Sequence, residues 1–526
     1  MAVQPVLIAG RWQTAHAAGT FQADNPTTAQ PLPDVYPVSA WQDCEAALAA
    51  AVEAAAKLRR LPPARLAAFL ERFAERIEGR ADELVAMAHA ETGLPVKPRL
   101  AEVELPRTTG QLRQAAAAAR TGSWALPTID TKLNIRSCYM PLGPVAVFGP
   151  NNFPFAFNSV AGGDFAAAIA AGNPVIAKAN TSHPGTSRLL AEEAQQALQE
   201  CDLPGGTVQM LYRTGHADGE RLVADPRLAA TGYTGSRTAG LALKRAADAA
   251  GKPIYLELSS INPVVILPGA LTERGDKIAE EFASSCLMGT GQFCTNPGLV
   301  LLLAGAATER FVVDVAQRFE AAPPGTLLSA SVARNLATSV QTLAAAGADL
   351  LAGGAAVSTG GYRYNNTLLK VTGKQFLQAP ERLQTEAFGN ESLVVVAQDA
   401  REAAAVLDQL EGNLTGCIYS DTQGSDDSLY TDLAEHLRPK VGRLLNDKMP
   451  TGVAVSAAMN HGGPYPATGH PGFTAVGIPA SIHRFAMLAC FDNVRLARLP
   501  ELLQNKNSTG AWRLVDGAWT QGDIHG

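Results

Sequence analysis

The sequence lacks a long hydrophobic run, a basic block and a signal peptide. Its net charge is −6 and charged residues make up only 17% of the chain, which argues against binding to nucleic acid or to an anionic membrane surface. The longest apolar stretches are far shorter than the roughly 20 residues that cross a bilayer. The N-terminus, MAVQPVLIAGRWQ, has neither the basic nor the apolar region of a secretion signal. We therefore expect a cytoplasmic protein with no membrane or nucleic-acid partner.

Cysteine is scarce and scattered. The 7 cysteines form no CxxC pair, and the histidines are not spaced as zinc ligands. We therefore expect no metal site and no disulfide framework. An odd, dispersed set in a long chain indicates reduced thiols, one of which can be reactive.

Strands and helices alternate regularly from Gly143 onward. Short apolar strands are predicted at 144–148, 174–179, 208–212, 229–235 and 253–258. Helices are predicted between them at 157–172, 186–200, 219–225 and 238–251. Strands that are apolar on both faces and alternate with helices indicate a parallel sheet covered on both sides. We therefore predict an α/β, Rossmann-like doubly wound domain.

A second α/β pattern begins near Asn262, and two segments fit neither pattern. The segments 126–143 and 494–499 are interpreted either as edge or subunit-pairing strands or as surface loops. At roughly 150 residues per domain, 526 residues suggest about three domains. We expect a dinucleotide-binding domain at 1–125 and 144–258 and a catalytic domain at 259–465. The segments 126–143 and 466–526 are expected to form a small β oligomerisation element and a C-terminal tail.

The usual dinucleotide fingerprint GxGxxG is absent, but another phosphate-compatible turn is present. The segment TGSRTAG (234–240) lies between a predicted strand and helix. Gly235 lets backbone approach a phosphate, Ser236 supplies a hydroxyl, and the helix start offers free N–H groups. A capped helix after a glycine turn explains the same residues.

Cys294 lies in GTGQFCTNPG, a glycine-rich loop that exposes a thiol better than a helix interior does. The alternative is a small buried hydrophobic residue, and Cys286 on a helical stretch fits that role better. No basic residue adjoins Cys294, so its activation requires dipoles, a cofactor's positive ring or a base distant in sequence.

Two further residues follow predicted strands of the first sheet. Glu257 closes the strand at 253–258, where open α/β sheets place their ligands, and suits a general base. A salt-bridged or helix-capping carboxylate is an equal alternative. Asn152 in GPNNFP can donate to an oxyanion, although turn formation is the commoner role of such an Asn.

Taken together, these segments resemble the aldehyde dehydrogenase superfamily over nearly the whole chain. The resemblance is carried by GPVAVFGPNNFP, AKANTSHPG, TGYTGSRTAG, LELSSINP, GQFCTNPG and TEAFGNES. Within the superfamily, FPFAFNSVAGGDFAAAIAAG, HPGTS, ELSSINPV and AMNHGGPYPAT resemble an NADP-linked bacterial branch. That branch contains 2,5-dioxopentanoate (α-ketoglutarate semialdehyde) dehydrogenases and a long-chain fatty aldehyde dehydrogenase.

The resemblance implies a covalent mechanism of aldehyde oxidation. Cys294 would attack the aldehyde as a thiolate, and the Asn152 amide and the Cys294 backbone N–H would hold the oxyanion. Hydride transfer would leave a thioester, and Glu257 would activate the water that hydrolyses it. His461 in NHGG matches a histidine near the cysteine and is a second catalytic candidate.

The resemblance also assigns the cofactor residues. Glu386 would hold the nicotinamide ribose beside Phe388, and Gly235 and Ser236 would form the pyrophosphate turn. Lys178 would contact the adenosine ribose or its phosphate. Members that prefer NAD usually carry Glu three residues after that lysine, where a carboxylate repels a 2′-phosphate. Thr181 occupies this position and Arg213 adds positive charge, so we predict NADP use, with NAD possible.

Departures from the family pattern concern the substrate more than the chemistry. Asn151 replaces a common Trp, Asn390 replaces a common Pro, and 467–481 differs from the dioxopentanoate enzymes. We predict an acidic semialdehyde such as 2,5-dioxopentanoate as substrate. The alternatives are a medium- or long-chain fatty aldehyde, a CoA-acylating reaction, a cysteine-dependent esterase or hydrolase, and a non-catalytic relative. A homodimer or homotetramer is expected, with contacts at 126–143 and 486–500.

Overall fold

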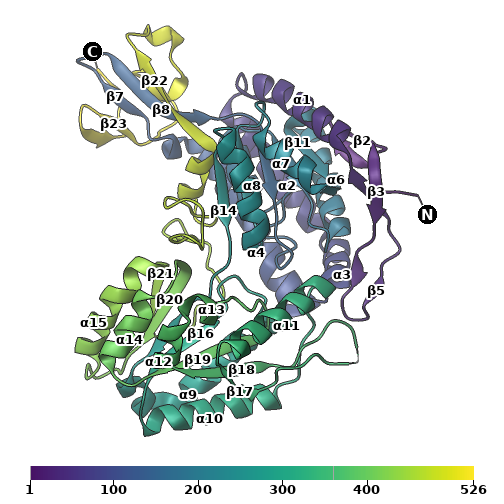
Figure 1. The fold of residues 1–526 in the computed structure, drawn as a ribbon. Helices are drawn as coiled ribbons and strands as arrows, with labels where there is room; N and C mark the ends of the chain where they lie inside the picture. Colours follow the sequence, from purple (N-terminus) through teal and green to yellow (C-terminus); the bar gives the residue numbers. More distant parts are fainter. Residues whose placement is uncertain (1, 359, 526) are drawn as a thin grey trace.

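The computed structural model describes residues 2–358 and 360–525. Within them, two seven-stranded sheets lie one above the other in Figure 1, and a five-stranded sheet projects from the upper one beside the C-terminus. Smaller sheets of three and two strands lie near the N-terminus. No helix of this part of the chain is long and apolar enough to cross a membrane.

The first sheet winds outward from its central strand in both directions. Its strand order is β14-β13-β9-β10-β11-β1-β2. The five parallel strands are β9 (Val145–Phe148), β10 (Val175–Lys178), β11 (Val208–Leu211), β13 (Ala230–Thr234) and β14 (Ile254–Glu257). The chain runs β9→β10→β11 on one side and then crosses to β13→β14 on the other. Right-handed crossovers therefore place helices on opposite faces, and the prediction of a doubly wound parallel sheet is confirmed.

The helices around this sheet form two packed groups. Helix α7 (His216–Ala224) packs against α8 (Arg237–Ala249) and α1 (Trp41–Leu58). Helix α2 (Pro63–Gly79) packs against α4 (Leu105–Thr121), α5 (Gly163–Ala170) and α6 (Pro184–Glu200). The sheet extends beyond the predicted strands, because β1 (Val6–Ile8) and β2 (Arg11–Gln13) add antiparallel pairs at its edge.

The predicted helix at 157–172 is too long, because α5 begins only at Gly163. Asn158 diverts the preceding chain into turns. Its side-chain oxygen accepts from the Val160 N–H at 2.9 Å, and its amide donates to Pro154 and Ser187. An Asn side chain that bonds local backbone competes with the helix and delays its start. The result is a buried turn between β9 and α5 instead of a helical one.

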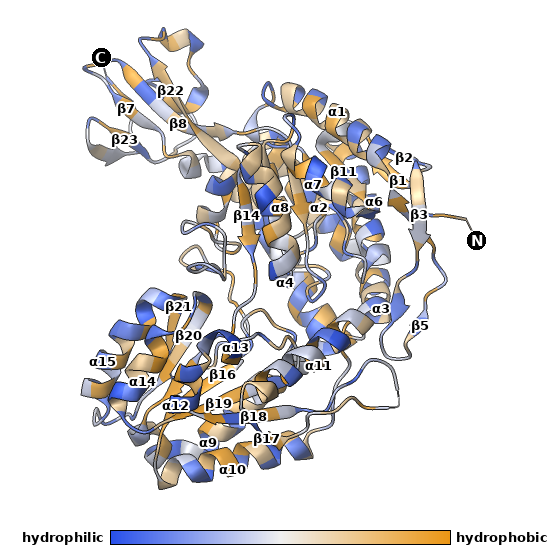
Figure 2. Ribbon diagram, in the orientation of Figure 1, coloured by the Kyte–Doolittle hydropathy of each residue, from blue (hydrophilic) through white to orange (hydrophobic). Residues whose placement is uncertain are grey.

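The second sheet contains β17 (Asp349–Ala352), β18 (Thr367–Thr372), β19 (Glu391–Ala397), β16 (Leu299–Leu303), β15 (Val264–Ile266), β20 (Asn413–Tyr419) and β21 (Val441–Asn446), in this order. All but β17 pair in parallel. Hydrophobic residues line β16 and β19, while α9 (Pro268–Leu287) and α10 (Ala306–Ala321) carry hydrophilic patches (Figure 2). The second predicted α/β pattern is therefore confirmed.

The projecting sheet has the order β22-β8-β7-β23-β24. Its strands are β7 (Thr128–Asp130), β8 (Ile135–Pro141), β22 (Ala486–Asp492), β23 (Arg513–Val515) and β24 (Ala518–Thr520). The strand interpretation of 126–143 is confirmed as a hairpin. The strand interpretation of 494–499 is wrong, because Leu496–Arg498 is a 3-10 helix. Strand β22 ends at Asp492 opposite the start of β8, and Asn493 follows in a left-handed turn with φ +53°.

Candidate active site

Predicted site residues from four segments meet at one edge of the first sheet. Asn152, Lys178, Gly235 and Glu257 lie at or just past the carboxyl ends of β9, β10, β13 and β14. The winding direction reverses between β9 and β13, and open α/β sheets bind ligands at such a switch point. The topology thus gathers these side chains where a cofactor and substrate can be bound.

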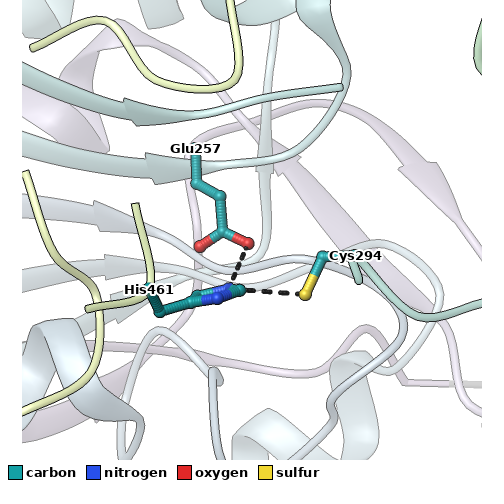
Figure 3. Close-up of side chains that lie close together, drawn as sticks. All are labelled: Glu257, Cys294 and His461. Atoms are coloured by element: carbon teal, nitrogen blue, oxygen red, sulfur yellow. Dashed lines mark hydrogen bonds and ion pairs between the residues drawn. The ribbon is translucent and has the colours of Figure 1, made fainter. Parts of the chain in front are cut away.

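Cys294, His461 and Glu257 form a contiguous cluster at this edge, as Figure 3 shows. Nε2 of His461 lies 2.8 Å from Oε1 of Glu257 and 3.4 Å from Sγ of Cys294. The side chains of His461 and Glu257 are only 1% and 2% exposed, whereas Cys294 is partly exposed. Cys294 is therefore more accessible than Cys286, which is fully buried. This difference agrees with the expectation that the Cys294 thiol is the accessible one of the two.

One imidazole nitrogen serves both neighbours in this cluster. In a nucleophile–His–carboxylate triad, the carboxylate binds the ring nitrogen opposite to the nucleophile. Here the carboxylate and the thiol both contact Nε2, which donates when it carries a proton and accepts when it does not. Oε2 of Glu257 is buried and has no protein partner among the described residues. A carboxylate oxygen in this state can accept a hydrogen bond from a water molecule and withdraw its proton.

Burial raises the pKa of the Cys294 thiol well above its usual value, and the nearby Glu257 carboxylate raises that pKa further. The charge of Arg107 acts in the opposite direction and lowers the pKa. The thiol is therefore protonated at neutral pH unless another group takes its proton. Nε2 of His461 is in contact with the sulfur, where the sequence around Cys294 offers no basic residue.

The loop that carries Cys294 is fixed from both sides. The Asn262 side-chain amide donates to the backbone oxygens of Cys294 and Asn296, both at 2.9 Å. Gly291 has φ +67°, and a Cβ there would lie 1.9 Å from the backbone oxygen of Gly389. Only glycine allows this approach between the cysteine loop and the loop of Glu386. Sequence reasoning missed Asn262 as a site residue, although SSINP was already singled out as a motif.

Asn152 is held against the cysteine loop. Its side-chain amide donates to the Gln292 carbonyl at 3.0 Å, two residues before Cys294. The amide has a second N–H, which remains for an oxyanion. Asn152 is 5% exposed, so this donor works in a largely desolvated environment.

His461 reaches the cluster on a long irregular segment that follows β21. Its backbone N–H donates to Oγ1 of Thr474 at 3.0 Å, and its carbonyl accepts from the Ala475 N–H at 2.9 Å. The same segment runs along the end of β14, where Thr468 forms a bridge with Glu257. The fold therefore brings together two residues, His461 and Glu257, that are 204 positions apart.

The residues predicted to contact the phosphate of the cofactor form a positively charged corner at the end of β10. They are Lys178, Thr181 and Arg213. Burial, and to a lesser extent the charge of Arg213, lower the pKa of Lys178 to about 8. Thr181 is partly exposed three residues later, and Arg213 is exposed. Two cations and a hydroxyl without a carboxylate between them suit a phosphate group, and the residues present thus fit a phosphorylated cofactor.

The predicted pyrophosphate turn shows the helix-capping feature that was its alternative explanation. Oγ of Ser236 accepts from the Ala239 N–H at 3.4 Å and caps α8. Ser236 is exposed and Gly235 is partly exposed, so the start of α8 faces accessible space. Capping uses one N–H of the first turn and leaves others for an anion.

Glu386 and Phe388 line a small cleft beside the cysteine loop. The cleft is also lined by Ser260, Ile261 and Thr385. Burial raises the pKa of Glu386 to about 7, and its Oε1 accepts from the Ser260 N–H at 3.3 Å. The cleft connects the Glu386 loop with the cysteine loop, because Phe293 and Asn296 line it too.

Two other sequence observations have structural outcomes. Asn390 is buried and its amide donates to the Tyr364 carbonyl and to the Asn366 side chain, so it packs inside the second sheet region.

The ligand-type atoms of Glu257, Cys294 and His461 lie within 4.8 Å of one another, a separation that one Zn²⁺ ion can bridge. The sequence predicted no metal site, and that expectation stays a prediction.

The fold thus gathers a thiol, a carboxylate and an amide at the switch point of a doubly wound sheet, where such α/β sheets bind their ligands. The chain belongs to the aldehyde dehydrogenase family, whose sequence model matches residues 12–462. It is therefore an enzyme that oxidises an aldehyde with a nicotinamide cofactor.

Curated relatives match almost the whole chain. A protein of Azospirillum brasilense named alpha-ketoglutaric semialdehyde dehydrogenase 2 is 41% identical over 97% of this chain and 98% of its own. An alpha-ketoglutaric semialdehyde dehydrogenase of Acinetobacter baylyi is 36% identical over 97% of both chains. The crystal structure of PnpE in complex with nicotinamide adenine dinucleotide superposes with a TM-score of 0.80 at 21% identity, covering 95% of this chain and 100% of that one. This last similarity concerns the fold.

Proposed function

We propose that this enzyme oxidises an acidic semialdehyde, such as 2,5-dioxopentanoate, to the dicarboxylate with NADP. The shared contact of His461 with Cys294 and Glu257 carries the catalytic part of the proposal, because it links a nucleophile to two proton acceptors. The names of the Azospirillum and Acinetobacter relatives support the substrate class.

In the first half of the reaction, Cys294 attacks the aldehyde carbon. The thiol proton passes to Nε2 of His461 or onward to Glu257, and the sulfur forms a bond to the carbon. The aldehyde oxygen becomes an oxyanion, which the free N–H of the Asn152 amide stabilises. The nicotinamide, when bound, supplies the hydride acceptor. Loss of hydride from the same carbon leaves a thioester on Cys294.

In the second half, the thioester is hydrolysed. Oε2 of Glu257 accepts a proton from water, and the resulting hydroxide attacks the thioester carbon. The carbon–sulfur bond breaks and Cys294 leaves as a thiolate, which recovers a proton from the His461–Glu257 pair. A buried carboxylate oxygen without a protein partner suits this step. It favours hydrolysis over transfer of the acyl group to CoA.

The cofactor preference rests on the corner at the end of β10. Lys178 and Arg213 offer positive charge, and Thr181 offers a hydroxyl where a carboxylate would repel a 2′-phosphate. Glu386 and Phe388 are proposed to hold the nicotinamide half, with Gly235 and Ser236 beside the pyrophosphate. These assignments predict NADP as the better cofactor, with NAD also used.

Two alternatives are weighed by particular observations. The cysteine-hydrolase alternative is disfavoured, because the carboxylate occupies the same imidazole nitrogen as the thiol instead of orienting it from behind. The fatty-aldehyde alternative is favoured by an apolar cluster next to the cysteine loop. This cluster, which we call the aromatic cluster, comprises Phe153, Ala156, Phe157, Phe293, Phe473, Ala475 and Val476.

The arrangement of domains, assembly and compartment are also proposals. We propose that 1–125 and 144–258 bind the cofactor, that 259–465 carry the cysteine loop, and that 126–143 and 466–526 form the assembly element and tail.

The projecting sheet supports a dimer or tetramer, since its edge strand β22 exposes Met487 and Leu488 by 50% and 58%. The 7 free cysteines support a reducing compartment such as the cytoplasm.

A panel of aldehydes tests the proposed function. We would measure kcat/KM for 2,5-dioxopentanoate, succinic semialdehyde, decanal and benzaldehyde with NADP and with NAD, and identify the product by mass spectrometry. The proposal expects the acidic semialdehydes with NADP to be the best pairs and a dicarboxylate as product. A clear preference for decanal would establish the fatty-aldehyde alternative, and an acyl-CoA product in the presence of CoA would refute hydrolysis.

A further inference from the structure

Arg107 is a cation placed among aromatic rings in the first turn of α4. Its guanidinium carbon lies 5.2 Å from the ring centre of Phe157 and 5.7 Å from that of Phe153. Both rings belong to the aromatic cluster beside the cysteine loop. A cation over an aromatic face gains electrostatic attraction from the ring.

Within the described part of the chain, no carboxylate forms an ion pair with this guanidinium. Nε and Nη2 of Arg107 are buried and lack a hydrogen-bond partner within residues 2–358 and 360–525. Arginine stays charged under all ordinary conditions, so burial cannot be relieved by loss of a proton. The contacts with two rings compensate for the lost hydration only in part. A group that brings negative charge to this position would complete the compensation.

The neighbouring arginines Arg99 and Arg443 differ from Arg107 because both donate hydrogen bonds to protein groups. Arg99, which also contacts the Phe153 ring, forms an ion pair with Glu104 and donates to the Asn152 carbonyl at 3.0 Å. Arg443 has no carboxylate partner among the described residues, but it donates to the carbonyls of Pro450 and Gly452 at 3.1 and 3.2 Å. The guanidinium groups of Arg99 and Arg443 thus have structural partners.

The two rings that Arg107 contacts also lie close to the catalytic cluster. The Phe157 ring is 5.8 Å from the imidazole of His461, and the Phe153 ring is 5.5 Å from that of Phe293, the residue before Cys294. Burial lowers the pKa of Arg107, while the charges of Glu104, Cys294 and Glu257 raise it. The guanidinium therefore lies in the electrostatic field of the catalytic cluster.

We propose that Arg107 binds the carboxylate of the acidic semialdehyde, with its aldehyde end at Cys294 and its short carbon chain against the aromatic cluster. This inference rests on the proposed function and names the group that selects its substrate. A planar guanidinium binds a carboxylate through two parallel hydrogen bonds, which Nε and Nη2 are arranged to make. The apolar lining then serves the methylene groups between the two ends instead of a long fatty chain.

A matched pair of substrates tests the inference. We would compare 2,5-dioxopentanoate with its methyl ester, which keeps the shape and removes the charge, on the wild-type enzyme and on Arg107→Met. Hydrogen bonds to a charged group predict a fall in kcat/KM of about 10- to 100-fold for the acid, mainly through KM. The rate on the ester is expected to change by less than about threefold, since neutral substrate loses no ion pair.

Two further variants serve as controls. Arg120 lies on the same helix α4, is half exposed and pairs with Glu71 at 2.8 Å, so Arg120→Met should leave both substrates unchanged. Arg107→Lys keeps the charge but not the paired geometry and should give an intermediate loss on the acid alone. If Arg107→Met does not fold, Arg107→Lys still tests the inference through the acid-to-ester ratio.

The outcomes separate the two proposals. An equal loss on acid and ester would overturn the role of Arg107 and leave it a packing residue, while the wild-type preference for the acid would still stand. A preference for the acid that survives in both Arg107 variants would also overturn it. A wild-type enzyme that oxidises the ester as well as the acid would instead refute the acidic-substrate part of the proposed function.

Discussion

Glu257 and His461 are joined by a 2.8 Å contact between Oε1 and Nε2, although 204 residues separate them in the chain. The same nitrogen contacts Cys294, so the three side chains form one connected cluster. The arrangement explains how a thiol with a raised pKa can still lose its proton at the moment of attack. The predictions below follow from this cluster and from the loops that position it.

Replacement of the proposed nucleophile should remove catalysis and spare cofactor binding. We expect Cys294→Ala to lower kcat by at least about 10³-fold, because no other group can form the thioester. NADP binding, measured by quenching of protein fluorescence, should stay within about threefold of wild type. Cys286→Ala is the control, since this cysteine is buried in the second sheet region. Substantial activity in Cys294→Ala would refute the covalent mechanism.

The Glu257 carboxylate should hinder ionisation of Cys294 and assist hydrolysis. Because Glu257 raises the pKa of the Cys294 thiol, Glu257→Gln should lower that pKa and increase the thiolate fraction at any pH below it. The rate of alkylation by iodoacetamide across pH measures this shift. Arg107→Met should move the same profile to higher pH, because Arg107 lowers the pKa of Cys294. Shifts in the same direction would contradict the assignment.

Hydrolysis of the thioester gives a second readout for Glu257. We expect Glu257→Gln to lower steady-state kcat by about 10²- to 10⁴-fold while a burst of NADPH equal to the enzyme concentration persists. The burst, followed by stopped-flow absorbance, reports hydride transfer before the blocked step. If the burst disappears together with turnover, Glu257 acts in the attack of Cys294 instead.

A carboxylate at position 181 should alter the choice of cofactor. Thr181→Glu places a negative charge beside Lys178 and is expected to lower the kcat/KM ratio of NADP to NAD by about 10- to 100-fold. Thr181→Gln has a similar size without the charge and should shift the ratio much less. An unchanged ratio in Thr181→Glu would place the 2′-phosphate elsewhere.

The close approach of the cysteine and Glu386 loops should make Gly291 irreplaceable. Gly291→Ala must strain a backbone with φ +67° and push a methyl group against the Gly389 carbonyl, which predicts a loss of about 2–4 kcal/mol of stability. Gly251→Ala is a matched control, because Gly251 has φ +66° and nothing within 4 Å of the added atom. Its loss should be only about 1 kcal/mol. Thermal unfolding of both variants, compared at one scan rate, measures the difference.

The exposed edge of the projecting sheet should mediate assembly. Strand β22 has no partner on its outer side within the described residues and presents Met487 and Leu488 to solvent. We expect the double substitution of both residues by Lys to reduce the apparent mass in light scattering by half or more, since charges block edge pairing. Trp519→Lys at the opposite edge is the control. An unchanged mass would place the interface elsewhere.

Residue patterns by themselves determined the parallel sheet and the approximate positions of its strands. Apolar runs such as 144–148 and 208–212 are buried on both faces, so their composition reports their environment directly. Local competition was harder to foresee. At Asn158, one side chain displaced the start of a helix, and after β22 the chain turned at Asn493 instead of continuing as a strand. The residue at which a helix or strand begins or ends depends on hydrogen bonds with neighbouring groups. The hydrophobic periodicity of the sequence does not report these bonds.

The sequence also determined the candidates for chemistry. Cys294 on a glycine-rich loop and Glu257 at the end of a strand were identifiable because motif type and strand position constrain what a side chain can reach. Only the tertiary structure decided that His461 contacts the sulfur, that the Asn262 amide bonds the cysteine loop, and that Arg107 has no ion-pair partner among the described residues. These relationships join segments more than 30 residues apart, and distance in the chain carries no information about contact in space. The tertiary fold brings these segments together and creates the contacts on which the proposed reaction depends.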